Sequence, residues 1–82
     1  MTMHGLPKLS LAAQNLKPGL YRHFKGGDYE VIGVGRDSED PTNELVVYRK
    51  VDTGERWVRP LENFLATIER DGYSGPRFTY LK

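Results

Sequence analysis

The residues of this sequence that could do acid–base chemistry gather around His23, which is followed by Lys25 and then by Glu30. A histidine titrates near neutral pH, and a neighbouring carboxylate can fix its tautomer, as a general base requires. The sequence places no nucleophile and no third polar group beside this pair. We therefore expect His23 and Glu30 to form a structural pair, and we assign no catalytic residue.

Three other motifs have the residue types of known sites without their full pattern. The tripeptide Asp-Thr-Gly at 52–54 is the short signature of aspartic proteases, but charged residues follow it and it falls where a hairpin turn is needed. The tripeptide Gly-Val-Gly at 33–35 lacks the third glycine and the following helix of a dinucleotide site. The acidic segment 37–44 lacks the central glycine of a calcium loop, and two histidines without a cysteine make a poor zinc site. We expect no cofactor and no metal.

The strongest candidate for binding is a set of aromatic and basic residues that alternate in two strand-like runs. If 53–54 form a two-residue turn, Lys50 lies opposite Trp57 and Tyr48 lies opposite Arg59, with all of them on one face. Aromatic rings stack on bases for about 1–3 kcal/mol each, while cations hold phosphates. The alternative is that the rings form core and the cations only reach past them to solvent. The predicted ligand-binding residues are Tyr21, His23, Lys25, Tyr48, Lys50, Trp57, Arg59 and Arg77.

Arg59 directly precedes Pro60, and Arg77 directly precedes Phe78. One interpretation is that they stack on an aromatic ring or bridge to a carboxylate such as Glu30 or Glu62. The other is that they contact a ligand.

These residues need a scaffold of strands, and the first hairpin is the clearest part of it. Strands are predicted over 20–25 and 28–36, joined by two glycines that suit the positive φ angles of a tight turn. A two-residue loop places Lys25 opposite Asp28 and His23 opposite Glu30, which pairs complementary charges. A three-residue loop is the alternative, and it matches the facing residues less well.

The second of these strands carries apolar residues on both faces. Tyr29 and Val31 lie on one face, and Ile32 and Val34 lie on the other. A flat sheet with one wet face would alternate more cleanly, so the pattern predicts a curved sheet or a small barrel. The glycines at 33 and 35 fit a bend or a bulge in this strand.

The rest of the chain predicts strands over 44–52, 55–59 and 77–81, with a helix between the last two. Pro60 suits the first turn of that helix, and apolar residues recur at helical spacing at Leu61, Phe64, Leu65 and Ile68. Residues 1–18 are expected to form an N-terminal tail in which Ser10 can cap a helical turn. Residues 19–82 are expected to form a single domain.

Length and composition restrict the class of protein. The chain has 82 residues, no cysteine and a net charge of +1. One small core must therefore hold without disulfides, and no strong field selects a nucleic acid or a membrane. No apolar run reaches the roughly 18 residues of a spanning helix, and the N-terminus lacks the pattern of a signal peptide. We expect a cytoplasmic monomer with no membrane partner.

Several short motifs occur in the order typical of one family. They are Tyr21, His23, Lys25-Gly26, Tyr29, Val31, Tyr48, Trp57-Val58-Arg59-Pro60-Leu61, Phe64 and Arg77-Phe78. With them, residues 19–78 resemble the small bacterial family called domain of unknown function 1653. The resemblance implies a compact SH3-like β-barrel or roll, here of about five strands with one short helix before the last strand. It implies no activity, substrate or cofactor.

Three classes of function remain open for such a domain. A protein-interaction module that takes a peptide across the aromatic and basic face, or along a sheet edge, is the favoured hypothesis. Binding of nucleic acid or another anionic ligand on the same face is the alternative, although the near-zero net charge counts against it. An enzyme comes third, because His23 is its only candidate residue. Salt dependence separates the first two classes, since nucleic-acid binding falls steeply with salt.

Overall fold

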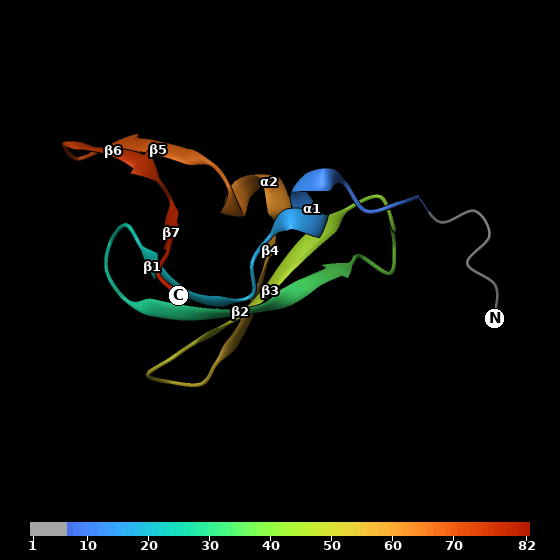
Figure 1. The fold of residues 1–82 in the computed structure, drawn as a ribbon, viewed down its shortest axis with the longest axis horizontal. Helices are drawn as coiled ribbons and strands as arrows, with labels where there is room; N and C mark the ends of the chain where they lie inside the picture. The colour runs from blue at the N-terminus through green and yellow to red at the C-terminus, as the bar shows by residue number, and fades with distance from the viewer. Residues whose placement is uncertain (1–6) are drawn as a thin grey trace.

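The computed structural model describes residues 7–82, which form seven strands and two short helices (Figure 1). In chain order these are α1 (Leu11–Asn15), β1 (Gly19–His23), β2 (Asp28–Arg36), β3 (Glu44–Lys50), β4 (Arg56–Pro60), α2 (Leu61–Phe64), β5 (Thr67–Arg70), β6 (Tyr73–Pro76) and β7 (Phe78–Tyr80). Five strands form an antiparallel sheet in the order β4-β3-β2-β1-β7, and β5 pairs with β6 in a separate hairpin. The predicted mainly β class is confirmed, with a short helix before the last strand. The sheet is an open roll rather than a closed barrel.

A bulge in β2 curves the main sheet. The pairing of β2 with β3 shifts between Val31 and Gly33, so Ile32 is the extra residue. One extra residue reverses which face the following side chains occupy. Val34 therefore lies on the same inner face as Val31, and Ile32 is exposed to solvent. The predicted bend at Gly33 is confirmed, whereas the face predicted for Val34 is wrong because the prediction assumed an unbroken strand.

Aromatic rings dominate the core, which lies between the inner face of the sheet and the two helices (Figure 1). Phe64 of α2 is 1% exposed and stacks on Phe78 of β7, with ring centroids 4.2 Å apart. The rings of Tyr21 and Tyr48 meet Phe64 edge-on at 5.4 and 5.7 Å. Because each aromatic ring buries a large apolar area, a few of them give this short chain its core.

The first hairpin has a longer turn than either loop predicted from the sequence. Arg22 is opposite Asp28, and Leu20 rather than His23 is opposite Glu30. The Arg22 guanidinium donates to Asp28 at 2.9 Å, which stabilises this register. The turn also reaches across to the last strand, since the Phe24 amide donates to the carbonyl oxygen of Arg77 at 2.9 Å. Both predicted pairings are therefore wrong, although Gly26 and Gly27 do have the expected positive φ angles.

The second hairpin is shifted by two residues from the predicted pairing. Tyr48 is opposite Trp57, and Arg59 is opposite Val46. The loop spans 51–55 and is therefore longer than the predicted two residues. A shift of two residues keeps every side chain on its face. The predicted grouping of Tyr48, Trp57 and Arg59 on one face is correct, while the predicted opposing pairs are wrong.

The segment after α2 differs most from the sequence prediction. The helix ends at Phe64, and Ile68 belongs to β5 instead of continuing the helix. Asp71 and Gly72 connect β5 to β6 with φ angles of 53° and 80°. Two consecutive positive φ angles are typical of a tight hairpin turn, for which Asp-Gly is a strong signal. The predicted helix was too long because the spacing of the apolar residues fits both a helix and a helix followed by a strand.

Residues 7–18 lie against the domain. Ser10 caps α1 as predicted, accepting a hydrogen bond at 3.0 Å from the Ala13 amide. Its own amide and hydroxyl donate to the carboxylate of Glu44 at 2.6 and 2.7 Å. Ala13 is buried in the core, whereas Leu11 is 74% exposed. Residues 1–6 of the predicted tail lie outside the described residues. Along the described part of the chain, no helix has the length and apolarity to cross a membrane.

Candidate binding site

Arg59 is the central residue of the candidate site, and β4 places it on the inner side of the sheet. Its Nε donates to the hydroxyl of Tyr48 at 3.1 Å, and its Nη1 donates to Oδ1 of Asn63 at 2.6 Å. The guanidinium lies over the ring of Phe78, 5.6 Å from the centroid. A guanidinium held by hydrogen bonds and a ring face is fixed in one orientation, so little freedom is lost when it binds a ligand.

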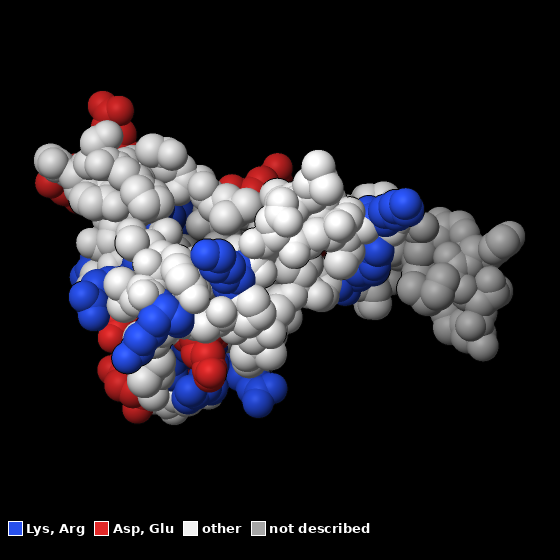
Figure 2. All heavy atoms as spheres, viewed as in Figure 1, with Lys and Arg blue, Asp and Glu red and all other residues white. Residues whose placement is uncertain are grey.

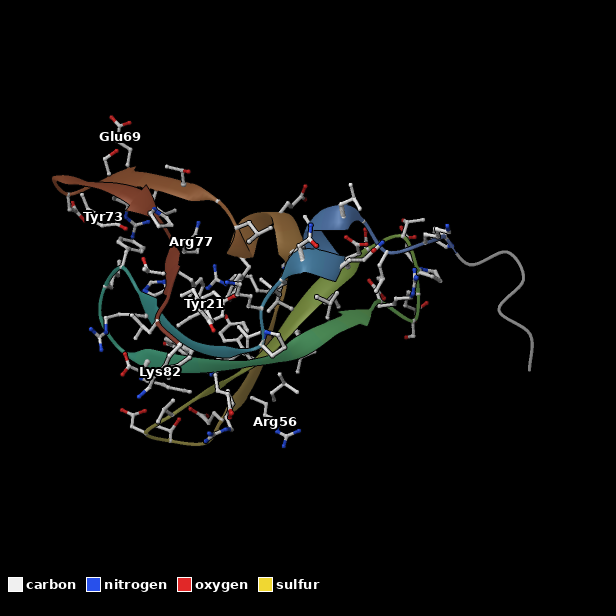
Figure 3. All side chains as sticks on the ribbon, in the orientation of Figure 1. Tyr21, Arg56, Glu69, Tyr73, Arg77 and Lys82 are labelled. Carbon is white, nitrogen blue, oxygen red and sulfur yellow. The ribbon has the colours of Figure 1, made fainter. Side chains whose placement is uncertain are left out.

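Asn63 of α2 also holds a second arginine. Its carbonyl oxygen accepts a hydrogen bond from Nε of Arg77 at 3.2 Å. Arg77 lies between α2 and β7 (Figure 3), and its backbone amide donates to the carbonyl of Ala66 at 2.9 Å. One residue therefore brings two guanidinium groups together from opposite ends of the sheet order, since Arg59 is on β4 and Arg77 adjoins β7.

His23 lies beside these arginines at the end of β1, where it is opposite Phe78. Its ring packs against the rings of Phe24 and Phe78, with centroids 4.8 and 4.9 Å away. Nδ1 accepts a hydrogen bond from the Lys25 amide at 3.2 Å, which leaves Nε2 to carry the proton of the neutral ring. Burial, and then the charges of Arg59, Arg77 and Lys25, lower the pKa of His23. His23 is therefore a neutral hydrogen-bond donor near pH 7.

No carboxylate among residues 7–82 neutralises the positive charge of this site. Within residues 7–82 the ion pairs join Arg22 to Asp28, Arg49 to Glu30 and Arg70 to Asp71, and neither Arg59 nor Arg77 has a carboxylate partner. The His23–Glu30 pair predicted from the sequence is wrong, because Glu30 forms an ion pair with Arg49, with 2.8 Å between Nη2 and Oε1. Figure 2 shows basic and acidic groups side by side over the lower part of the sheet. Both cations of the site therefore remain without an ion-pair partner among the described residues.

The other predicted residues differ in how far they are exposed to solvent. Tyr48 is buried and supports Arg59, while Trp57, opposite Tyr48, keeps 49% of its surface exposed. Tyr21 is buried and its hydroxyl donates to the Lys17 carbonyl at 2.7 Å, so it has no free surface for a ligand (Figure 3). Lys25 is exposed in the turn between β1 and β2, and Lys50 is half-buried at the end of β3.

Asn63 is the residue that the sequence analysis missed. An asparagine in a predicted helix carries no chemistry of its own and is a common residue of turns. The available signal was its position four residues after Arg59, just beyond Pro60, which ends β4 and caps α2. The two side chains meet where the strand turns into the helix.

The acidic segment after β2 forms turns rather than a cation site. Asp37 accepts from the Glu39 amide at 2.8 Å, and Asp40 accepts from the amide and the hydroxyl of Thr42 at 3.1 and 2.6 Å. Across the described residues, no group of three or more histidine or carboxylate side chains is placed to hold a metal ion.

The fold and the site define a class: a small, mainly β domain in which one asparagine accepts hydrogen bonds from two arginines. A family model described as protein of unknown function (DUF1653) matches residues 19–80. The chain belongs to this family, and the resemblance found in the sequence is confirmed. It is similar to the crystal structure of a DUF1653 protein from Bordetella bronchiseptica, with 30% identity and a TM-score of 0.76 over 84% of this chain and 91% of the other. No curated protein sequence matches the chain.

Proposed function

We propose that this chain is a small cytoplasmic, monomeric binding module that takes an acidic side chain of a protein or peptide partner between Arg59 and Arg77. The observation that carries this proposal is the pair of guanidinium groups fixed by Asn63 with no carboxylate partner among the described residues. Two fixed like charges repel each other, and an anion between them removes that repulsion.

The hydrogen bonds of the two arginines support a carboxylate as the bound group. Arg59 uses Nε and Nη1 inside the fold, and Arg77 uses Nε. The remaining N–H groups point to no partner in residues 7–82, and a guanidinium edge matches the two oxygens of a carboxylate. Nε2–H of His23 adds a neutral donor beside them.

The surroundings favour a peptide over a nucleic acid. The open edge of β4 adjoins the site, because β4 pairs with β3 alone within the described chain. An extended peptide can add to such an edge, with an apolar side chain against the half-exposed ring of Trp57. A nucleic acid carries a charge at every nucleotide and needs a track of cations, whereas Arg22, Arg49 and Arg70 beyond this site are each paired with an acid.

The test is a binding titration of the full chain with a short peptide that alternates leucine and glutamate, and with a single-stranded RNA of similar length. We expect the peptide to bind, and Arg77→Gln to weaken binding about tenfold, because a charge-assisted bidentate pair is lost. Arg70→Gln is the matched control, since Arg70 is an exposed arginine on β5. If RNA binds more tightly than the peptide, and its affinity falls steeply as salt rises, the ligand is a nucleic acid and the peptide proposal is wrong.

A further inference from the structure

A second surface lies between the helices, away from the arginine site. A groove of about 630 Å³ opens between α1, α2 and the start of β3. Its floor consists of Leu45, Leu61 and Leu65, and Ala12 forms the wall on the side of α1. Leu65 is 48% exposed, so part of this floor is in contact with water. The volume is in the range of clefts that hold several side chains or a small molecule.

The wall formed by α1 lies outside the residues that the family model matches. The family match begins at residue 19, whereas α1 spans Leu11–Asn15. The helix is anchored by the small side chain of Ala13 and by the bonds between Ser10 and Glu44. Its large side chain, Leu11, points outward and is 74% exposed. A helix that served only to cover the core would bury its leucine, because burying one contributes about 1.5–3 kcal/mol.

The charges of the groove are all of one sign. Asp37, Glu44 and Glu62 line it, and no lysine, arginine or histidine does so among the described residues. The amide and then the hydroxyl of Ser10 lower the pKa of Glu44, so this carboxylate stays ionised. The nearby Arg36 donates instead to the carbonyls of Pro7 and Pro41. Figure 2 shows uncharged atoms over α1 with acidic atoms beside them over α2.

We propose that this groove binds a peptide segment of a partner protein in which a lysine or arginine stands next to aliphatic side chains. The aliphatic side chains of the peptide cover Leu45, Leu61 and Leu65, and its cation forms an ion pair with Glu62, which has no ion-pair partner within residues 7–82. This surface is separate from the arginine site and has the opposite charge preference. It does not depend on the function proposed above.

The experiment records ¹⁵N amide shifts of the full chain during titration with two short peptides of equal length. One peptide alternates leucine with arginine, and the other alternates leucine with glutamate. The basic peptide is expected to shift the amides of Ala12, Glu62 and Leu65 and to leave Arg77 unmoved. The acidic peptide reports on the arginine site, so failure at one surface is distinguished from failure at the other.

Two variants test the groove without disturbing the core. Leu65→Ser removes an exposed apolar side chain, and Glu62→Gln removes one charge. Each is expected to weaken the basic peptide about fivefold, while Glu69→Gln on the exposed β5 strand leaves it unchanged. The proposal is overturned if the basic peptide shifts no groove amide at millimolar concentration, or if it binds the Leu65→Ser variant as tightly as the parent chain.

Discussion

Asn63 determines how the two arginines of the site are arranged. Its side-chain oxygen accepts from Arg59 and its backbone carbonyl accepts from Arg77, so one residue of α2 fixes a cation of β4 and a cation from the bend between β6 and β7. Because its amide is neutral, it positions these cations without neutralising them. An acidic side chain in the same place would neutralise one of the two positive charges inside the protein and leave less charge for a partner.

Asn63→Asp is therefore expected to raise the stability of the fold and to weaken binding of the acidic peptide. The new carboxylate pairs with Arg59, which raises the free energy of unfolding by about 0.5 kcal/mol at this exposed position. It also competes with the ligand and should weaken the acidic peptide about tenfold. Denaturant unfolding and peptide titration measure the two effects on the same sample. Unchanged peptide affinity in this variant would show that the arginines do not bind the ligand.

His23 makes stability depend on pH in a defined direction. Burial, followed by Arg59, Arg77 and Lys25, lowers the pKa of His23 in the folded chain below its ordinary value of about 6.5. The unfolded chain therefore takes up the proton first as pH falls. The stability linked to neutral His23 is complete above about pH 6.5 and is lost as the pH falls from there through the folded-state pKa.

The measurement for His23 is the free energy of unfolding at about pH 7.5 and about pH 5, above the range in which most carboxylates titrate. The parent chain should lose more stability over this interval than His23→Gln, whose side chain does not titrate. His4 is present in both proteins and so does not bias the difference. Equal losses in the two proteins would contradict the environment described for His23.

Among the elements, the β5–β6 hairpin depends on the backbone of its turn. Gly72 has a φ of 80°, and a Cβ added there would meet no atom within 4 Å. Gly72→Ala should therefore destabilise the hairpin by about 1 kcal/mol through backbone strain alone. Hydrogen exchange of the β5 and β6 amides detects this change. Faster exchange should be confined to these strands, and Gly33→Ala, at a negative φ with open space, is a comparison for the effect of the methyl group alone.

The elements also show what the sequence could predict about register. Alternation identified the strands and the face shared by Tyr48, Trp57 and Arg59, since these depend only on a period of two. Pairing depended on loop length, and both main loops are longer than predicted because they make contacts outside their own hairpins. The Phe24 amide bonds to Arg77, and the Val51 amide bonds to Asp28. Contacts of that kind come from the tertiary structure and leave no local pattern.

At the scale of the whole molecule, charge is separated although the net charge is only +1. Arg59 and Arg77 form an unneutralised positive site, whereas Asp37, Glu44 and Glu62 surround the groove beside α1. The amino-acid composition could indicate only that any charged surface covers a small part of the molecule, because the positive and negative charges nearly cancel. Which charges remain unpaired depends on the register of the sheet. The register places Glu30 opposite Arg49, where the two form an ion pair, so Glu30 does not pair with the arginines of the site.

Some residues of the candidate site were predictable from the sequence, but Asn63 and the arrangement of the site were not. Residue types and strand alternation identified Tyr48, Trp57 and Arg59 from the sequence, and His23 and Arg77 were recognised as their neighbours. Convergence on Asn63 requires α2 to stop after Phe64, so that the chain returns through β5 and β6 to place Arg77 beside it. The Asp-Gly turn at 71–72 signals that return, and the helical spacing of the apolar residues obscured it.

The most direct test of the central claim is a ¹⁵N titration that follows the side-chain Nε–H signals of Arg59 and Arg77 at low salt. Addition of the leucine–glutamate peptide should shift both arginine signals together with the side-chain amide of Asn63, since the three groups are joined by hydrogen bonds. The Nε–H signal of Arg70 serves as the internal reference and should not move. Binding of the peptide with the Arg59 and Arg77 signals unmoved would contradict the assignment of this site.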